Sequence, residues 1–388
     1  ACSFKDNYIT DIFLSNPELL PYSLVGNMTP IIPSRIAHLL DLKGPTMVID
    51  TACSSSLIAV HEACQSIYTG TCEMAVASGI KIHLLPTTSE YFKMGIESSD
   101  GKTRAFDQLA DGSGIGEGVA AVLLKPLKQA EKDLDHIYGV IKGLAVNSDG
   151  TALGLTAPNP GSQTRVILDA WEHSGIQPDK IEYIEAHGTA TSLGDPIEIQ
   201  GLTKAFQKFT DKKQFCALGS VKTNFGHLFE CAGMASLIKV LLSMKKDVIP
   251  ATLNFVKPND KIDFINTPFF INARKRKWRS KNPSLRVAGL SAFGLSGTNC
   301  HLVLSGYQRE ETNISHFQGQ SNLLTISAKS SYSLHKLVEL YHKYIEDNFD
   351  LFDLKQFCFQ ANRYRVAMEH RIALIVNNKK DLLEQIKS

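Results

Sequence analysis

Along most of this chain, short apolar runs typical of strands alternate with longer runs whose apolar residues recur at helical spacing. The strand candidates are the runs 46–50, 74–78, 119–124, 138–146, 181–185, 286–290 and 301–304. The helix candidates are the runs 54–68, 161–174 and 234–244. Because strands and helices follow one another instead of forming separate blocks, this alternation predicts an α/β fold class.

Two polar stretches divide the chain. The charged run 125–136 separates two strand candidates, and the run 307–321 is a polar linker. Beyond the linker, strands at 323–327 and 371–376 and helices at 334–345 and 380–386 predict a small separate α/β unit. We therefore expect four segments, 1–134, 135–306, 307–321 and 322–388.

The composition argues against several classes of partner. Lys and Arg total 41 and Asp and Glu total 39, with no basic block beyond the short run 274–277. Neither nucleic acid nor a membrane surface is therefore expected as a partner. The 8 cysteines show no zinc spacing, and a disulfide framework would be unusual in a chain of 388 residues. We expect reduced thiols, no metal and a cytoplasmic location.

The run 50–56, Asp-Thr-Ala-Cys-Ser-Ser-Ser, is the sharpest local feature. A predicted buried strand ends there, small residues turn the chain, and a predicted helix begins. Cys53 would then lie beside a helix N-terminus, where unpaired N–H groups and the helix dipole favour an anion. Such a position lowers the pKa of a thiol and makes it a nucleophile. The motif alone is equally compatible with an inert buried cysteine.

Two histidines follow predicted strands on loops rich in Gly and Thr. His187 lies in Glu-Ala-His-Gly-Thr-Ala-Thr, which is bounded by Gly-Asp-Pro at 194–196, and His227 ends the run Lys-Thr-Asn-Phe-Gly-His. Loops at strand ends are where α/β enzymes keep catalytic groups. A single histidine on a loop is nevertheless more often structural, so each is only a candidate.

Taken together, these motifs resemble a known family. The cysteine run, the His187 loop and the Lys222–His227 loop have the order and the approximate spacing found in β-ketoacyl synthases, as do the runs 100–118 and 291–301. The tail, with Glu-His-Arg at 369–371, is similar to the post-ketosynthase linker of bacterial modular polyketide synthases. The resemblance covers essentially the whole chain and implies a thiolase-like, layered αβαβα fold of two similar halves.

The resemblance implies a role for each matching residue. Cys53 would carry the growing acyl chain as a thioester. His187 and His227 would bind the carbonyl of a malonyl-type extender, promote its decarboxylation and stabilise the enolate. Lys222 would organise the second histidine and the local charge. The remaining roles are an oxyanion hole from the N–H groups of Cys53 and Phe293, a gate at Phe293, phosphopantetheine binding at Thr189 and Thr191, and support from Gly294 and Asn299.

The resemblance also implies partners. The region would bind no cofactor itself, because phosphopantetheine is carried by the partner acyl carrier protein. A homodimer and an acyltransferase, in cis or in trans, complete the expected set. The intact Cys53 and His187 argue against starter-type and non-elongating variants, and the linker-like tail argues against a thiolase. A scaffold that only docks carrier proteins, and the identity of the acyl chain, stay open.

Two departures from the family pattern are visible. Many modular ketosynthases have Glu directly after His-Leu, where this chain has Phe229. Family members also carry further strands and helices before the segment that begins here, so the first half of the fold is expected to be incomplete.

We therefore predict that residues 1–388 alone are poorly soluble or inactive, because apolar sheet surface would be left uncovered. Expression of these residues only, followed by size-exclusion chromatography and a condensation assay, tests this. A soluble protein of this length that condenses would contradict the prediction.

Overall fold

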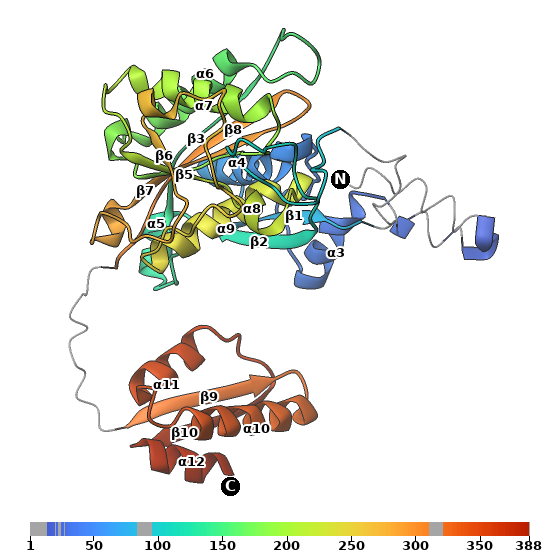
Figure 1. Cartoon of the computed structure of the whole chain (residues 1–388). Coiled ribbons are helices and arrows are strands. Elements are labelled where there is room, and N and C mark those ends of the chain that lie inside the picture. Colours follow the sequence, from blue (N-terminus) through green and yellow to red (C-terminus); the bar gives the residue numbers. More distant parts are fainter. Residues whose placement is uncertain are drawn as a thin grey trace. The chain divides into compact units, whose positions relative to one another are not determined.

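The computed structural model describes residues 14–19, 21, 25–26, 28–83, 95–309 and 321–387. The chain divides into two compact units, Ala1–Arg309 and Glu310–Ser388. Figure 1 shows the first as a layered α/β body and the second as a small hairpin packed with helices. Each unit has its own hydrophobic core. Among the described residues, no helix is both long and apolar enough to cross a bilayer.

A six-stranded mixed sheet forms the centre of the first unit. Its strand order is β3-β8-β7-β4-β5-β6. Strands β7, β4, β5 and β6 run parallel, while β8 is antiparallel to both β7 and β3. The strand bounds are β3 Val140–Ser148, β4 Tyr183–Glu185, β5 Cys216–Gly219, β6 Phe269–Ile271, β7 Val287–Phe293 and β8 Thr298–Ser305.

Helices cover both faces of this sheet. On one face lie α6 (Pro160–Ser174) and α7 (Gly194–Gln207), and on the other lie α4 (Ser55–Tyr68) and α9 (Ala232–Lys245). The antiparallel pair β1 (Ala75–Lys81) and β2 (Gly118–Leu124) packs on α4 and α9. Figure 1 shows the resulting order of layers, α6 and α7, the large sheet, α4 and α9, and then β1 and β2. This is the layered α/β architecture that the sequence predicts.

Each face of the large sheet has a separate core. Side chains of α6 and α7 fill one core, which includes the fully buried Val166, Ile167, Leu202 and Phe206. Side chains of α4 and α9 fill the other, which includes Leu57, Val60, Met234 and Leu237. Because helices pack on both faces of the sheet, β7 is buried along its whole length. A strand buried on both faces has a mainly apolar sequence, which is why this run was predicted as a strand.

Short elements complete the first unit. They are α3 (Ile31–Leu40), α5 (Leu127–Lys132), α8 (Lys222–Phe225) and the 3-10 turns η1 (Pro17–Leu19), η2 (Ala52–Ser54), η4 (Pro178–Lys180), η5 (Phe229–Cys231), η6 (Phe264–Asn266) and η7 (Pro283–Leu285).

Helix α6 shows how local sequence sets its bounds. The side chain of Asn159 accepts from the N–H groups of Gly161 and Ser162, and Pro160 occupies the first helical position. Gly175, with a φ of 63°, ends the helix in a left-handed conformation. A polar N-cap, an N-terminal proline and a C-terminal glycine are the signals that favour a helix of this extent.

Two local predictions are wrong. The run 46–50 is not a strand, because within the described ranges no neighbouring strand supplies hydrogen bonds to it, and Met47 is 54% exposed. The strand predicted at 74–78 does not end before Gly79, which lies inside β1 (Ala75–Lys81). The missing side chain of Gly79 serves packing, since a Cβ there would lie 2.9 Å from the Cα of Cys231.

The second unit pairs β9 (Asn322–Ala328) with β10 (His370–Val376) in antiparallel register. Helices α10 (Ser331–Asp347), α11 (Leu354–Arg363) and α12 (Lys379–Lys387) accompany this hairpin, and α11 is absent from the sequence prediction. Ser330 and Asp353 cap α10 and α11 with their side chains. The core includes Leu324, Ile345, Val376 and Leu382. Most of the predicted linker lies outside the described residues.

Gly143 generates a stability prediction. A Cβ at this position of β3 would lie 2.2 Å from the carbonyl oxygen of Ala170 in α6, a backbone atom that cannot rotate away. We expect Gly143→Ala to lower the free energy of unfolding by about 1–3 kcal/mol, measured by urea unfolding. Gly154→Ala is the matched control, since the nearest neighbour of its Cβ would be 3.9 Å away. Equal effects of the two changes would contradict the packing argument.

Candidate active site

Cys53 lies in a tight turn that side-chain hydroxyls hold in place. It belongs to η2, directly before α4. The hydroxyl of Ser54 donates to the carbonyl of Thr51 at 2.9 Å, and that of Ser55 donates to the carbonyl of Ala52 at 2.7 Å. Ala52 has a φ of 54°, a left-handed conformation that costs a non-glycine residue roughly 1–2 kcal/mol. The turn leaves Cys53 only 6% exposed.

The protonation state of Cys53 differs from the sequence prediction. A lowered thiol pKa is expected beside a helix N-terminus, but the pKa of Cys53 is raised above its usual value. Burial is the largest cause, and it outweighs the positive charge of Lys222 and the backbone N–H of Leu295, which both act in the opposite direction. The prediction of a lowered pKa is therefore wrong. The group is a thiol whose anion Lys222 can stabilise.

Two buried carboxylates shape the His187 loop, which follows β4. Glu198 accepts from the N–H of His187 at 2.7 Å and from the N–H of Gly188 at 2.8 Å. Asp195 accepts from the N–H of Ala190 at 2.9 Å, and Ala190 has a φ of 57°. Burial raises the pKa of both carboxyls to about 7. Neither role was predicted, although the two acids stand three residues apart at the start of α7, on one helix face.

Lys222 connects Cys53 to the His187 loop. Its side chain is 2% exposed, and its ammonium donates to the backbone carbonyl of His187 and lies 3.4 Å from His187 Nδ1. Burial lowers the pKa of Lys222, while the negative charges of Cys53, Glu198 and Asp195 act in the opposite direction. One cation thus interacts with the nucleophile, with a histidine and with the carboxylates that hold the loop.

A buried ion pair fixes the backbone just before Lys222. Glu185 at the end of β4 accepts from the N–H of Val221 at 2.5 Å and pairs with Lys239 of α9 at 2.7 Å. The hydroxyl of Tyr183 donates to the same carboxylate at 2.5 Å. The start of α8 is therefore tied to a strand of the central sheet and to α9.

His227 is fully buried and held from both sides. Its N–H donates to the carbonyl of Gly114 at 2.6 Å, and its carbonyl accepts from the N–H of Gly116 at 3.1 Å. Its Nδ1 accepts from the N–H of Phe229 at 3.0 Å, so the neutral ring carries its proton on Nε2. Within the described part of the chain, Nε2 has no hydrogen-bond partner. The ring centroid lies 5.8 Å from that of His187.

Both imidazoles are neutral in this environment. Burial lowers the pKa of His187 and of His227 well below the usual value, and the charge of Lys222 lowers both further. A neutral His227 with Nε2–H can donate one hydrogen bond to a carbonyl oxygen without bringing a charge of its own. That is the arrangement required to stabilise a negative charge that develops on that oxygen.

Phe293, at the end of β7, lies beside His187. The ring centroids are 5.8 Å apart, and the N–H of Phe293 points at His187 Nδ1 at 3.4 Å. In this structure the predicted oxyanion donor therefore faces the histidine. Gly294 allows the close approach of this segment to the nucleophile turn, since a Cβ there would lie 2.5 Å from the carbonyl oxygen of Thr51.

The other predicted residues hold neighbouring loops. Thr189 and Thr191 lie on the His187 loop with their hydroxyls 3.3 Å apart, and Thr191 also accepts from the N–H of Gly194. Asn299 donates to the carboxylate of Asp149 at 2.7 Å. The structure gives Asn299 no contact with the histidines, so its place is at the base of the β7–β8 turn.

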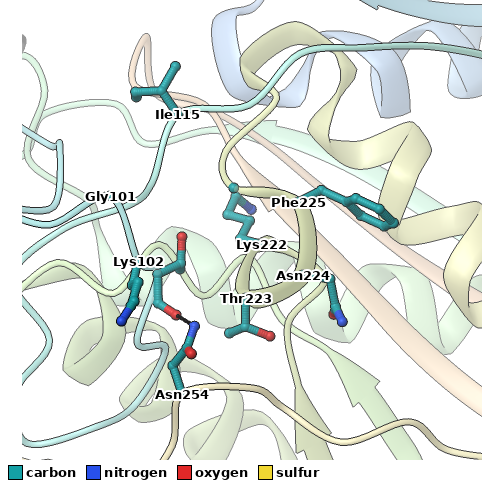
Figure 2. Close-up of a pocket in the computed structure, with 10 residues that line it drawn as sticks. Gly101, Lys102, Ile115, Lys222, Thr223, Asn224, Phe225 and Asn254 are labelled. Carbon is teal, nitrogen blue, oxygen red and sulfur yellow. Dashed lines mark hydrogen bonds between the residues drawn. The ribbon is translucent and has the colours of Figure 1, made fainter. Parts of the chain in front are cut away.

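A cavity of about 280 Å³ borders the site through Lys222. Figure 2 shows its lining from the segments 101–103 and 222–226 together with Ile115 and Asn254, whose amide donates to the carbonyl of Thr103. Cys53 and the two histidines are not among the lining residues. In the part of the chain that the structure covers, no group of three or more His, Cys, Asp or Glu could hold a metal ion.

The raised pKa of Cys53 generates a prediction for its alkylation. Because only the thiolate reacts, the rate with iodoacetamide should rise about tenfold per pH unit between pH 7 and 9 without levelling. Lys222→Met removes a charge that lowers this pKa, so it should slow alkylation at a fixed pH. Mass spectrometry of the Cys53 peptide measures both rates, with Lys245→Met as the control. A plateau below pH 8 would contradict the raised pKa.

Comparisons with known proteins support one family. Residues 2–130 match the model of the β-ketoacyl synthase N-terminal domain, and residues 138–256 match that of its C-terminal domain. Residues 322–386 match a CurL-like polyketide synthase C-terminal model. Two polyketide synthases of Bacillus subtilis, PksL and PksM, are 41% and 40% identical to this chain, each over 93% of its length. The chain spans only 8% of each of these two relatives.

Solved structures agree. The ketosynthase from module 6 of the bacillaene synthase of Bacillus subtilis has a TM-score of 0.80 at 40% identity, covering 94% of this chain and 64% of that one. The ketosynthase from module 1 of the bacillaene synthase of Bacillus amyloliquefaciens has a TM-score of 0.81 at 37% identity, covering 95% and 65%. With its two matched domains and these neighbours, the chain belongs to the β-ketoacyl synthases, in the form found in polyketide synthase modules.

Proposed function

We propose that this chain catalyses acyl transfer to Cys53 and decarboxylative Claisen condensation with a malonyl-type extender. The observation that carries the proposal is the position of the buried Lys222 ammonium, which lies 3.4 Å from His187 Nδ1 and whose charge lowers the pKa of Cys53 against the larger effect of burial. A neutral His227 lies next to His187. Nucleophile, cation and two neutral imidazoles in one buried site are what the reaction needs.

The first step is acylation. The Cys53 thiolate attacks the carbonyl of an acyl thioester, and the phosphopantetheine thiolate leaves with the electron pair and takes up a proton. Lys222 stabilises the attacking anion, which burial otherwise disfavours. We assign the N–H groups of Cys53 and Phe293 to the oxyanion of the tetrahedral intermediate. A donor of this kind is worth about 2.7–4 kcal/mol of barrier.

The second step is decarboxylation of the extender. The bond between the carboxylate carbon and Cα breaks, carbon dioxide leaves, and the electron pair moves into the thioester as an enolate. The Nε2–H groups of His187 and His227 donate to the enolate oxygen. The enolate carbon then attacks the acyl–Cys53 carbonyl, forms the new carbon–carbon bond and returns Cys53 as a thiolate, so the two half-reactions are balanced without a redox step.

The partners follow from this chemistry. Both thioesters are carried on the phosphopantetheine of an acyl carrier protein, and we assign Thr189 and Thr191 to binding its arm because they share the His187 loop. The chain itself binds no cofactor. A homodimer and an acyltransferase in cis or in trans complete the proposal, as does a location in the cytoplasm. The transfer-only and scaffold roles are the alternatives.

The test separates the two half-reactions in the full-length protein. We expect an acyl thioester to add its mass to Cys53, and malonyl carrier protein then to yield carbon dioxide and a 3-oxoacyl product. Cys53→Ala should abolish acylation. His227→Gln should keep acylation and lose condensation by about 100-fold or more. Acylation without condensation in the wild type would support a transfer role, and no acylation would support a scaffold.

A further inference from the structure

A buried cluster that the condensation mechanism does not use adjoins His227: Phe229 lies against the imidazole, Lys81 lies over Phe229, and Glu230 pairs with Lys81. The ring of Phe229 stacks on the imidazole with centroids 4.7 Å apart and planes inclined by 7°. The ammonium of Lys81 lies 4.6 Å from the Phe229 centroid and 3.3 Å from a carboxylate oxygen of Glu230. Lys81 is 4% exposed, Phe229 7% and Glu230 8%.

The burial of Lys81 needs an explanation. It follows Ala77 and Gly79 on the inward face of β1, where an apolar residue would cost nothing to bury. A buried ammonium is expensive even when it is paired, and an ion pair of this kind is weak evidence for stability. The close packing that Gly79 permits against Cys231 brings β1 next to η5, so that Lys81 reaches both Phe229 and Glu230.

The backbone of Phe229 is strained. Its φ is 43°, a left-handed conformation that a large side chain rarely adopts. In that conformation its N–H donates to His227 Nδ1 and its ring lies flat on the imidazole. Strain of this kind persists where the surroundings require it, and it is concentrated at functional sites. A single residue thus sets both the tautomer and the ring plane of His227.

The charges around His227 have opposite effects on its protonation. Lys81 on β1 and Lys222 on α8 disfavour a protonated imidazole, and the neighbouring His187 is itself neutral. Glu230 on η5 would favour protonation, but Lys81 pairs with it. Protonation would also place a second N–H on Nδ1, directly against the N–H of Phe229. Loss of Lys81 would leave Glu230 uncompensated beside the histidine.

We propose that Phe229 and Lys81 are positioning residues for His227. Phe229 fixes its ring plane and tautomer, and Lys81, which lies over the Phe229 ring and pairs with Glu230, supports its neutral form. The inference rests on the proposed function, since it assigns the oriented Nε2–H of His227 to the extender carbonyl. It gives a role to Phe229, which stands where many modular ketosynthases carry Glu. It also predicts that decarboxylation depends on these side chains while acylation of Cys53 does not depend on Phe229.

The first experiment varies Phe229 in the intact protein. Carbon dioxide release from malonyl carrier protein and acylation of Cys53 are measured separately. Phe229→Leu, which keeps an apolar side chain but removes the ring, should lower kcat for decarboxylation about tenfold or more, with KM and the acylation rate nearly unchanged. Phe229→Tyr should restore most of the loss. Phe209→Leu, which changes an exposed ring elsewhere, is the matched control.

The second experiment varies Lys81. Lys81→Met keeps the aliphatic stem and removes the charge, so the pKa of His227 should rise. The limb of the decarboxylation profile that follows His227 protonation, which lies below the inflection of Asp195 and Glu198, should move to higher pH. Lys81→Arg should leave the limb in place. Chemical shifts of the His227 ring nitrogens, assigned with His227→Gln, follow protonation and tautomer directly.

The outcomes are distinct. Equal losses of acylation and decarboxylation in Phe229→Leu, or no loss of either, would overturn the inference, as would nitrogen shifts that are the same in Lys81→Met and wild type. A wild-type protein that acylates but releases no carbon dioxide would refute the proposed function instead. The nitrogen shifts would still decide whether Phe229 and Lys81 control the tautomer and charge of His227.

Discussion

The ammonium of Lys222 is the interaction on which the site depends. It is buried, so its charge must be compensated. It lies 3.4 Å from His187 Nδ1. The charges of Cys53, Glu198 and Asp195, which we propose to carry out the chemistry or to hold the loop, raise its pKa against the effect of burial. Burial keeps both histidines neutral, and the charge of Lys222 adds to that effect. An arrangement that stabilises one anion, the thiolate, therefore also prepares two uncharged donors for a second anion, the enolate.

The layered fold brings these groups together from distant parts of the chain. Cys53 comes from the turn before α4, His187 from the end of β4, Lys222 and His227 from the segment after β5, and Phe293 from the end of β7. Strands β7, β4 and β5 run parallel, so β4 and β7 place their residues at the same edge of the sheet. This edge is the usual location of a site in an α/β sheet.

The residues that lie in recognisable short motifs could be predicted as candidates from the sequence. A turn of small residues, a Gly/Thr loop after a strand and a family motif single out Cys53, His187 and His227 as candidates. The helices predicted at 54–68, 161–174 and 234–244 match α4, α6 and α9 nearly to their ends, whereas α7 and α11 were not predicted. Prediction failed where the outcome depends on tertiary packing. Burial raised the pKa of Cys53, where a lowered pKa was expected. The run 46–50 has no partner strand in the described ranges. The sequence around Lys81 does not show that Phe229 and Glu230 lie next to it.

The buried carboxyls of the His187 loop have a consequence for how this protein responds to acidity. Asp195 and Glu198 have pKa values of about 7, whereas those of the histidines are far lower. An inflection near neutrality in a profile of turnover against pH would thus belong to buried carboxyls that hold the backbone of the His187 loop. Assigning that inflection to an imidazole, as is customary, would name the wrong residue.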